Sequence, residues 1–426
     1  MFKRHDYILG LTWLVILVLI PLPFIQTLSA GLPAVESSES LAIQLGTVAY
    51  VWMLTAIYLS TRPKWLDRLI GLPNMYMMHG IFSLLAIVLA YLHKLGSPSD
   101  GWIKTTGDWG LYLLIGLAIY ALVMMAGWLT NRVPILARLK QLLETAFKHE
   151  VTIWLHRLNL IATGLIFIHV ILIDYIRAIT PFMVIFVISS LFVFGSYLWS
   201  RLQPDYAGQP GTLIKIRPLS TNIQELTIQT KSKLQVKAGD YIFLSFPTIT
   251  GLKEPHPFSL VNDPKQGQSA LILAIRGDGD FTSRLQSLAA PIAVRIMGGF
   301  GMYQTVLDDQ KPQQLLVIAG GIGAVPLLSI VAAHPEIQTT MFYNAHQSDN
   351  LLYPNEFAAW QHRPNFTGYR QITRFSDQAV LSAIPNDIKQ LTVLIGGPDS
   401  MARHWIHQLK RAGVPRGQIY YEAFSW

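Results

Sequence analysis

Six mostly apolar runs, nearly free of charged side chains, fill the first half of the chain. Each is about 20 residues long, which is the length that an α-helix needs to cross a bilayer. The pattern predicts six transmembrane helices, at Tyr7–Leu28, Leu41–Thr61, Leu69–His93, Trp109–Asn131, Val151–Asp174 and Ala178–Ser200. The first run follows Lys3-Arg4, as a signal peptide would, but it exceeds the roughly 7–15 residues of a signal core. We therefore expect a retained anchor.

The basic residues of the loops are divided unequally between the two sides of this predicted membrane domain. Lys and Arg are enriched in the cytoplasmic loops of membrane proteins. We therefore expect both termini, and everything after the sixth helix, to be cytoplasmic at a plasma membrane. One side carries Lys3, Arg4, Arg62, Lys64, Arg68, Arg132, Arg138, Lys140, Lys148 and Arg201, and the other carries Lys94, Lys104 and Arg177.

From about residue 210 the pattern changes to short strands separated by Gly, Pro and Asp turns. These strands predict a small antiparallel β-barrel. From Gln314 onward strands alternate with helices, which predicts a doubly wound parallel sheet. The barrel strands are expected at Thr212–Arg217, Leu226–Gln229, Tyr241–Pro247, Pro257–Val261, Ala270–Ile275 and Val294–Met297, and the later strands at Leu315–Ala319, Thr339–Tyr343, Thr367–Ile372 and Thr392–Ile395.

The predicted fold is therefore multidomain, with three parts in chain order. Residues 1–202 form an all-α six-helix transmembrane bundle, residues 203–309 the antiparallel β-barrel and residues 310–426 the α/β domain. The last boundary lies near Asp308–Lys311, and helices are expected near residues 324–333, 376–384 and 399–411.

Composition narrows the chemistry that these domains can perform. Hydrophobic residues make up 51% of the chain and charged residues only 14%, which excludes a wholly soluble or disordered protein. The formal net charge is +8, but the basic residues fall singly between apolar runs, so we expect no nucleic-acid partner. The chain contains no cysteine. Disulfides, thiolate catalysis, cysteine-ligated zinc and iron–sulfur clusters are thereby excluded.

Four histidines lie inside two of the predicted spans, which run in the same direction through the bilayer. His79 and His93 are 14 residues apart in the third span, so their rings lie within about 40° of each other and roughly 21 Å apart along the axis. His156 and His169 are 13 residues apart in the fifth span. An ideal helix would leave those rings about 140° apart, so a local bulge or laterally offset ligands are required.

Histidines inside a span indicate a functional site by default. Each of the four could instead be an interfacial or packing residue, but two pairs at matched heights favour a common role. Imidazoles that face each other across a bundle without cysteine suit haem iron held by two axial histidines. Two such pairs predict two haems.

These histidine spacings resemble those of the ferric reductase and NADPH oxidase superfamily, whose membrane domain has six helices and two stacked b-type haems. The resemblance implies that His79 and His156 hold the cytoplasmic-side haem. It likewise implies that His93 and His169 hold the outer haem.

A second motif, His256-Pro257-Phe258-Ser259, resembles the flavin motif of the same superfamily. The resemblance implies that the Ser259 hydroxyl hydrogen-bonds the N5 edge of FAD and that His256 lies toward the ribityl-phosphate side. The segment Arg276-Gly277-Asp278-Gly279-Asp280-Phe281-Thr282 follows, before a helical run at Ser283–Leu288. Arg276, Thr282 and the helix start form a candidate pyrophosphate site. The alternative is a surface turn with a capping threonine.

Two glycine-rich segments resemble the nicotinamide motifs of ferredoxin-reductase-type proteins. Ala319–Pro326 follows a predicted strand and opens a helix, where glycine backbones can approach a diphosphate. The candidate nucleotide-binding residues are Gly320, Gly321, Gly323 and Pro326 in this segment and Gly397, Pro398 and Met401 in the second. The sequence departs from the family pattern at Gly396, where Cys is usual, and at Val325, where Thr or Ser is common.

The last residues complete the predicted flavin site. Relatives end with an acidic residue and an aromatic that covers the flavin ring, so Phe424, after Glu422, is the candidate, with Trp426 as second choice. The alternative is a terminal aromatic that packs against the sheet.

Together these features predict an NAD(P)H oxidoreductase that transfers electrons through FAD and two b-type haems to an external acceptor. Flavin is required because nicotinamide delivers electron pairs and haem accepts one electron. The expected acceptor is O2, giving superoxide, with a ferric chelate as the alternative. Rival interpretations are a haem-free anchor, transporter or sensor with a reductase tail, and a reductase of quinone within the bilayer. A modest preference for NADPH over NADH is expected, with Arg370 or Arg374 near the 2′-phosphate in place of His346.

Overall fold

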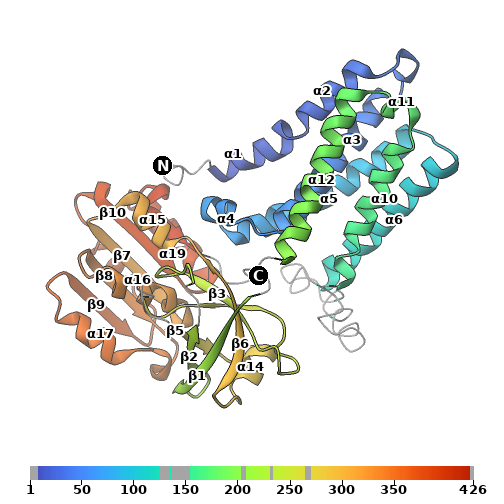
Figure 1. Cartoon of the computed structure of the whole chain (residues 1–426). Helices are drawn as coiled ribbons and strands as arrows, with labels where there is room; N and C mark the ends of the chain where they lie inside the picture. Colours follow the sequence, from blue (N-terminus) through green and yellow to red (C-terminus); the bar gives the residue numbers. More distant parts are fainter. Residues whose placement is uncertain are drawn as a thin grey trace. The chain divides into compact units, whose positions relative to one another are not determined.

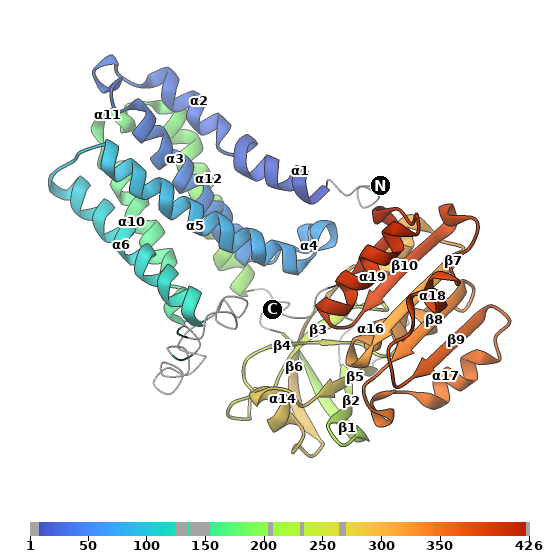
Figure 2. The same ribbon diagram turned by 180° about the vertical axis from the view of Figure 1, so that it is seen from behind.

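The computed structural model describes residues 8–124, 135, 138, 154–202, 208–230, 234–263 and 270–422. The chain forms two compact units (Figures 1 and 2). We call Leu9–Pro63 with Pro73–Arg201 the membrane unit, and Lys64–Leu72 with the described residues from Leu202 onward the reductase unit. Each unit is described by itself.

The membrane unit confirms the six predicted apolar helices. They span Ile8–Gly31, Ser40–Ser60, Leu72–Gly96, Gly101–Met124, Trp154–Ile171 and Thr180–Leu202, and each is long and apolar enough to cross a membrane. The first comprises α1 (Ile8–Leu14), a π-helical turn (Val15–Leu19) and α2 (Leu22–Gly31); the others contain α3 (Ser40–Ser60), α5 (Leu72–Gly96), α6 (Gly101–Met124), α10 (Asn159–Ile171) and α12 (Thr180–Leu202).

Aromatic rings and one buried hydrogen bond hold α3, α10 and α12 together. Phe186 on α12 stacks on Phe167 of α10, with ring centroids 5.2 Å apart, and its ring lies 4.8 Å from that of Tyr50 on α3. The Tyr50 hydroxyl lies 2.9 Å from the Ser190 hydroxyl. A buried phenol needs such a partner because an unpaired polar group in an apolar interior is costly.

The fifth span is tightened at its beginning, a feature that differs from both the local bulge and the laterally offset ligands expected from its 13-residue spacing. The amides of Arg157, Leu158, Leu160 and Ile161 each bond the carbonyl three residues earlier, at 2.9–3.1 Å. Such 3₁₀ bonding advances the chain by about 120° per residue, against about 100° in an α-helix. Each tightened residue therefore turns His156 about 20° closer to the face that carries His169. The four tightened residues together account for about 80° of the roughly 140° that separates the two rings on an ideal helix.

The reductase unit begins with the six-stranded antiparallel sheet that the sequence predicts. Its order is β4-β3-β6-β1-β2-β5. The strands are β1 (Gln209–Ser220), β2 (Ile223–Thr230), β3 (Tyr241–Ser245), β4 (His256–Ser259), β5 (Ala270–Arg276) and β6 (Ile292–Phe300). Side chains that alternate along these strands, including Leu213, Leu226 and Leu244, are fully buried and form the core. Alternation of apolar residues with period two is what makes this part of the fold readable from sequence.

A five-stranded parallel sheet follows, of order β11-β10-β7-β8-β9. Its strands are β7 (Gln314–Gly320), β8 (Gln338–Asn344), β9 (Phe366–Gln371), β10 (Leu391–Gly396) and β11 (Ile419–Tyr421), with helices α16 (Val325–Ala333), α17 (Pro354–Gln361), α18 (Asp377–Leu381) and α19 (Asp399–Arg411). The chain moves outward from β7 to β9 and then returns to the other side of β7. Ligands of such sheets bind where the strand order reverses, here between β7 and β10.

Several elements of the reductase unit were not predicted. They are α15 (Tyr303–Gln310), α17 and β11, together with α4 (Lys64–Ile70) between the second and third spans. The expected domain boundary near Asp308–Lys311 falls at the end of α15. The short helix α4 belongs by sequence to residues 1–202, yet it packs with the reductase unit.

Candidate functional site

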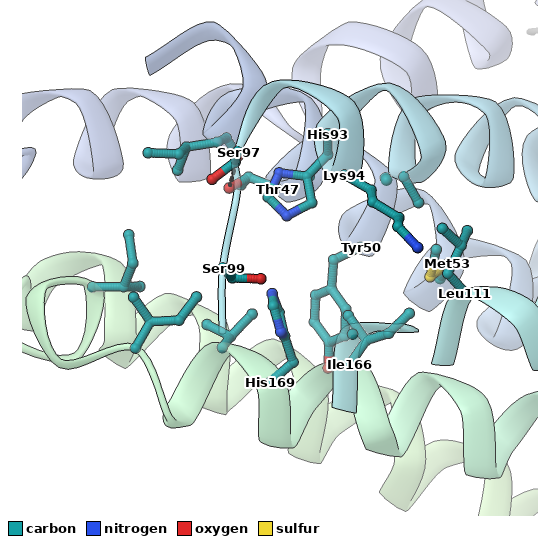
Figure 3. Close-up of a pocket in the computed structure, with 18 of the residues that line it drawn as sticks. Thr47, Tyr50, Met53, His93, Lys94, Ser97, Ser99, Leu111, Ile166 and His169 are labelled. Carbon is teal, nitrogen blue, oxygen red and sulfur yellow. Dashed lines mark hydrogen bonds between the residues drawn. The ribbon is translucent and has the colours of Figure 1, made fainter. Parts of the chain in front are cut away.

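Each of the four predicted haem histidines faces its expected partner in the membrane unit. The ring centroids of His79 and His156 are 5.9 Å apart, and those of His93 and His169 are 6.1 Å apart. Figure 3 shows the second pair, with His93 from α5 and His169 from α10 pointing toward one another. The two pairs thus lie at two levels of the same helix bundle.

The separations of these rings fit one metal ion between each pair. A metal–imidazole bond is about 2.0 Å long. Two imidazoles on opposite sides of one iron therefore have centroids about 6 Å apart. Both observed separations match that value, so the residues present fit bis-histidine haem ligation at each level.

Three of the four imidazoles are oriented by a main-chain carbonyl. The Nδ1 atoms of His79 and His93 lie 2.9 Å from the carbonyl oxygens of Ala56 and Ala42, both on α3. The Nδ1 atom of His169 lies 2.8 Å from the carbonyl oxygen of Ile103 on α6. An Nδ1–H that donates to a carbonyl leaves Nε2 as the metal-binding atom and fixes the plane of the ring.

The fourth imidazole has a different neighbour. Nδ1 of His156 lies 3.4 Å from the side-chain nitrogen Nδ2 of Asn159, which also donates a hydrogen bond to the His156 carbonyl oxygen at 2.7 Å. The inner pair therefore combines a carbonyl-bound ring with an amide-bound ring, whereas both rings of the outer pair are bound to carbonyls.

Two glycines create the room for the outer pair, and sequence reasoning missed both. Gly46 lies four residues after the accepting carbonyl of Ala42, and Gly107 lies four residues after that of Ile103. A Cβ atom at Gly46 would stand 2.8 Å from the His93 ring, and one at Gly107 would stand 3.0 Å from the His169 ring. The missing side chain uncovers the carbonyl of the preceding turn. The signal available in the sequence was a glycine within an apolar span, where a missing side chain can leave room for the ring of a neighbouring helix.

A cavity of about 240 Å³ lies beside the outer pair and is bordered by charged side chains at its edge. The Lys94 ammonium bonds a carboxylate oxygen of Asp108 at 2.7 Å and the hydroxyl of Tyr112 at 2.5 Å. Lys104 bonds the other oxygen of Asp108 at 2.7 Å. Two cations share one carboxylate, so this edge of the cavity carries net positive charge.

We expect substitutions at Gly46 and Gly107 to act on the outer haem alone. Gly46→Val or Gly107→Val should displace His93 or His169 and weaken haem binding at that level about tenfold or more. Haem content per chain, measured from the absorbance of the pyridine complex, should fall by half while flavin content is unchanged. Gly116→Val on α6 is the matched control, because a Cβ there would meet nothing within 4 Å. Normal haem content in both variants would contradict the assigned role.

The second part of the site is an open cleft of about 990 Å³ in the reductase unit. Its lining comes from β4 and β5 of the barrel and from the ends of β7, β8 and β10. It thus lies at the reversal of strand order, where nucleotide ligands bind in sheets of this kind. The predicted residues that line the cleft are Pro257, Phe258, Ser259, Arg276, Gly320, Gly321, Gly323, Pro326, Gly397, Pro398 and Met401.

The two glycine-rich segments meet at the floor of this cleft. A Cβ atom at Gly323 would stand 2.5 Å from the backbone of Gly397, and one at Gly396 would stand 2.3 Å from the carbonyl oxygen of Gly323. The close approach of two backbones leaves no room for a side chain at either position.

The barrel side of the cleft presents Ser259 at the end of β4, directly opposite Tyr241 of β3. Its hydroxyl has no hydrogen-bond partner within the described part of the chain. An open hydroxyl in a cleft fits the predicted contact with a flavin edge. His256 and Phe281 lie outside the cleft lining and stack on each other, with ring centroids 3.9 Å apart.

The predicted pyrophosphate residues have partners of their own. The Arg276 guanidinium forms an ion pair with Asp278, with contacts of 2.5 and 2.6 Å. The Thr282 hydroxyl accepts hydrogen bonds from the amides of Asp278 and Gly279, at 3.0 and 2.9 Å, and so caps the short helix α14 (Asp280–Leu285). Thr282 therefore caps this helix, and its role in a pyrophosphate site stays a prediction.

The two arginines considered for the 2′-phosphate are separated by the structure. Arg370 donates to the carbonyl of Leu351 and lies over the Tyr343 and Phe357 rings. Arg374 is exposed and lines the cleft together with His346. Of these two arginines, Arg374 is therefore the one within reach of a nucleotide in the cleft.

The covering aromatic remains a prediction. Phe424 and Trp426 lie outside the described residues. Glu422, two residues before Phe424, accepts a hydrogen bond from the amide of Met302 at the end of the barrel.

Comparison with known proteins supports the interpretation of the reductase unit as an FAD-binding module. Residues 210–403 match a family model described as an FAD-binding domain. Respiratory burst oxidase homolog protein A of Arabidopsis thaliana is 27% identical over 28% of this chain and 16% of its own length. Ferric reduction oxidase 3 of the same plant is 26% identical over 31% of this chain and 19% of its own length. Dual oxidase 2 of Rattus norvegicus is 23% identical over 63% of this chain and 19% of its own length.

Six apolar helices followed by an FAD-binding barrel and a parallel sheet of the nucleotide-binding type define the class, a multi-pass membrane flavoprotein. The FAD-binding family model and the relatives named as respiratory burst oxidase, ferric reduction oxidase and dual oxidase confirm the resemblance to the superfamily of NADPH oxidases and ferric reductases that was drawn from the motifs. The chain spans less than a fifth of the length of each of these relatives.

Proposed function

We propose that the protein transfers electrons from cytoplasmic NAD(P)H, by way of FAD and two b-type haems, to an acceptor outside the plasma membrane. The observation that carries the proposal is the facing of His79 with His156 and of His93 with His169. The ring centroids are about 6 Å apart in both pairs, and the pairs lie at different levels of the bundle. FAD and haem, when bound, supply the conversion from a hydride to single electrons.

The residues of the chain provide binding and orientation for this transfer. The glycine segments at 320–323 and 396–397 accept the nucleotide backbone, and Ser259 offers its hydroxyl to the flavin edge. Carbonyls of α3 and α6 hold the imidazoles of His79, His93 and His169 with Nε2 directed inward. The ring of His156 completes the inner pair.

O2 is the favoured acceptor, with superoxide as product. One NADPH and two O2 would give one NADP⁺, two superoxide ions and one proton. The charged edge formed by Lys94, Lys104 and Asp108 is net positive and would stabilise an anionic product beside the outer pair. A ferric chelate, itself commonly anionic, is the second candidate and would exploit the same charge.

We expect about two haems per chain in the purified protein, and selective loss when an outer ligand is removed. His93→Ala or His169→Ala should halve the haem content, because each removes one of two axial bonds at a single level. Flavin reduction by NAD(P)H should keep its rate. Reduction of external O2 or ferric citrate by vesicles should fall by about a hundredfold or more.

The same experiment separates the rival functions. Full haem content in both variants would refute the ligand assignment, and absence of haem from the parent would indicate a haem-free reductase. Reduction of quinone in the bilayer, without reduction of impermeant acceptors outside, would indicate a quinone reductase.

Coenzyme preference should depend on Arg374. We expect the parent to use NADPH with about tenfold higher kcat/KM than NADH, because a nearby cation stabilises the 2′-phosphate. Arg374→Ala should remove that difference, whereas Arg411→Ala, an exposed cation on α19 outside the cleft lining, should retain it. Equal use of the two coenzymes by the parent would defeat this prediction.

A further inference from the structure

A short helix between two membrane spans belongs to the reductase unit. α4 (Lys64–Ile70) follows the second span and precedes the third, yet its contacts place it with the barrel. Its buried side chains Leu66 and Ile70 lie on one face, while Lys64 and Trp65 are exposed. The chain therefore passes from the membrane unit into the reductase unit and back within nine residues, Lys64–Leu72.

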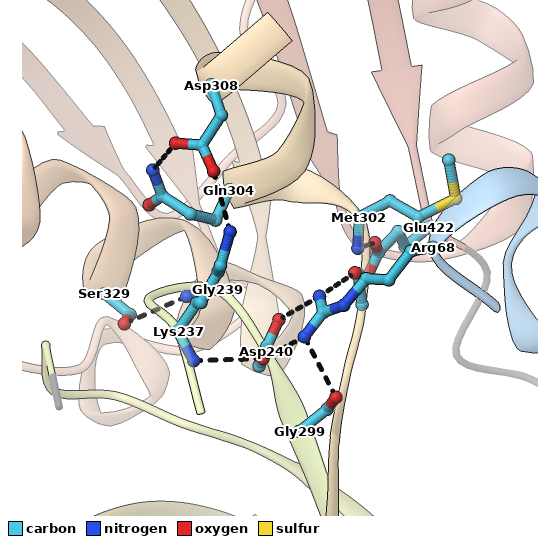
Figure 4. A network of polar contacts seen from close by, with 11 residues as sticks. Arg68, Lys237, Gly239, Asp240, Gly299, Met302, Gln304, Asp308, Ser329 and Glu422 are labelled. Atoms are coloured by element: carbon cyan, nitrogen blue, oxygen red, sulfur yellow. Dashed lines mark hydrogen bonds and ion pairs between the residues drawn. The ribbon is translucent and has the colours of Figure 1, made fainter. Parts of the chain in front are cut away.

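Arg68 makes a polar contact between this helix and the barrel (Figure 4). Its two terminal nitrogens bond the two carboxylate oxygens of Asp240, at 3.0 and 3.1 Å. The same nitrogens donate to the carbonyl oxygens of Gly301 and Gly299, at 2.6 and 3.0 Å. A paired contact of this kind uses the planar fork of arginine, which the single ammonium of lysine cannot reproduce.

Asp240 is fully buried, so it depends on that guanidinium. Besides Arg68, its side chain accepts one bond from the amide of Lys237, at 3.0 Å. Burial raises the pKa of Asp240, and the bonds and charge of Arg68 oppose the rise. Burial also opposes the charged form of Arg68, but Asp240 outweighs it and raises the pKa of Arg68 above its ordinary value. The paired contact joins a guanidinium to a carboxylate, so loss of Arg68 alone would leave the fully buried carboxylate of Asp240 uncompensated.

The barrel segment that receives Arg68 is shaped by glycine. Gly299 and Gly301 have φ values of +102° and +131°, which side-chain-bearing residues rarely adopt. A Cβ atom at Gly299 would also stand 2.4 Å from the carbonyl oxygen of Gln235 and 3.0 Å from the Asp240 carboxylate. The turn thereby directs two carbonyl oxygens at one point, next to a carboxylate. Such a set of acceptors matches a guanidinium.

The carboxylate that receives Arg68 lies next to the predicted flavin strands β3 and β4. Asp240 immediately precedes β3, whose first residue, Tyr241, pairs with Ser259 of β4. The carbonyl oxygen of Asp240 accepts a hydrogen bond from the amide of Leu260, the residue after Ser259, at 3.0 Å. Any shift of Asp240 would be transmitted to Ser259 through these two neighbouring contacts.

We propose that Arg68 is a positioning residue, which fastens the flavin-binding strands to the loop between the second and third spans through Asp240 and the glycine turn. Electron transfer out of the flavin should then depend on Arg68, whereas hydride transfer into the flavin, at the cleft between barrel and parallel sheet, should not. This inference rests on the proposed function where haem reduction is measured. A second measurement, hydrogen exchange in α4, tests the contacts of that helix alone.

The test uses the full-length holoenzyme in detergent or nanodiscs, with three variants. Arg68→Lys keeps the charge but loses the paired contact. Arg68→Gln combined with Asp240→Asn removes both charges, so that no ion is left buried and flavin binding is preserved. Lys64→Ala, an exposed cation on the same helix, is the matched control.

Two measurements are made on each variant. Anaerobic stopped-flow absorbance follows flavin reduction by NADPH and then haem reduction, and hydrogen exchange follows the amides of Lys64–Ile70. We expect haem reduction to slow about tenfold or more in Arg68→Lys and in the double variant, because small misplacements of reacting groups have large kinetic effects. Flavin reduction should stay within about twofold of the parent, and exchange in α4 should rise about tenfold or more. Lys64→Ala should match the parent in all three respects.

The outcomes separate this inference from the proposed function. If the parent holds no haem, the proposed function fails, while faster exchange in α4 of the Arg68 variants still supports the fastening role. If haem reduction and α4 exchange are both unchanged in Arg68→Lys and in the double variant, the inference is overturned. Slower flavin reduction that accounts for all of the slower haem reduction also overturns it, because Arg68 would then act on the flavin site itself.

Discussion

Burial of four imidazoles in an apolar helix bundle is the constraint on which the membrane unit depends. A neutral imidazole has one donor and one acceptor nitrogen, and in an apolar interior neither can be left without a partner at little cost. Helix carbonyls, which can accept a second hydrogen bond, take the donor of His79, His93 and His169. The acceptor nitrogen is then directed into the space between two rings. The orientation of these three imidazoles thus follows from the need to give Nδ1 a hydrogen-bond acceptor.

The same requirement explains why α3 matters although it carries none of the ligands. Ala56 and Ala42 are 14 residues apart on α3, as His79 and His93 are on α5, because the two consecutive spans run antiparallel. One helix therefore orients a ligand at each level. At the outer level, the absence of side chains at Gly46 and Gly107 also leaves room for the rings of His93 and His169. In the reductase unit, Gly323 and Gly397 use the same device to bring two backbones together where a nucleotide would lie.

The parts of the fold that the sequence predicted are those governed by local periodicity. Long apolar runs predicted the six helices, and short β-type runs bounded by Gly, Pro and Asp turns predicted all six barrel strands, because both patterns are local in the sequence. The 14-residue and 13-residue spacings placed the histidines in pairs. The tightening around Arg157 and Leu158 could not be predicted from the sequence, because it depends on which carbonyl oxygen each amide bonds. The segment Lys64–Ile70 reads as a charged loop, and its partner Asp240 lies 172 residues away.

Pairing across such distances also decides which charged residues are available to ligands. Arg276 and Arg370 both looked like anion-binding residues. In the fold Arg276 lines the cleft while it pairs with Asp278, whereas Arg370 is held by the Leu351 carbonyl and two aromatic rings. Arg374 also lines the cleft and has no such partner among the described residues. A cation counts toward a nucleotide site only after its local partners are known, which single-sequence reasoning cannot supply. Arg68 shows the converse: in the sequence it was one more basic loop residue, and in the fold it is the cation on which a fully buried carboxylate depends.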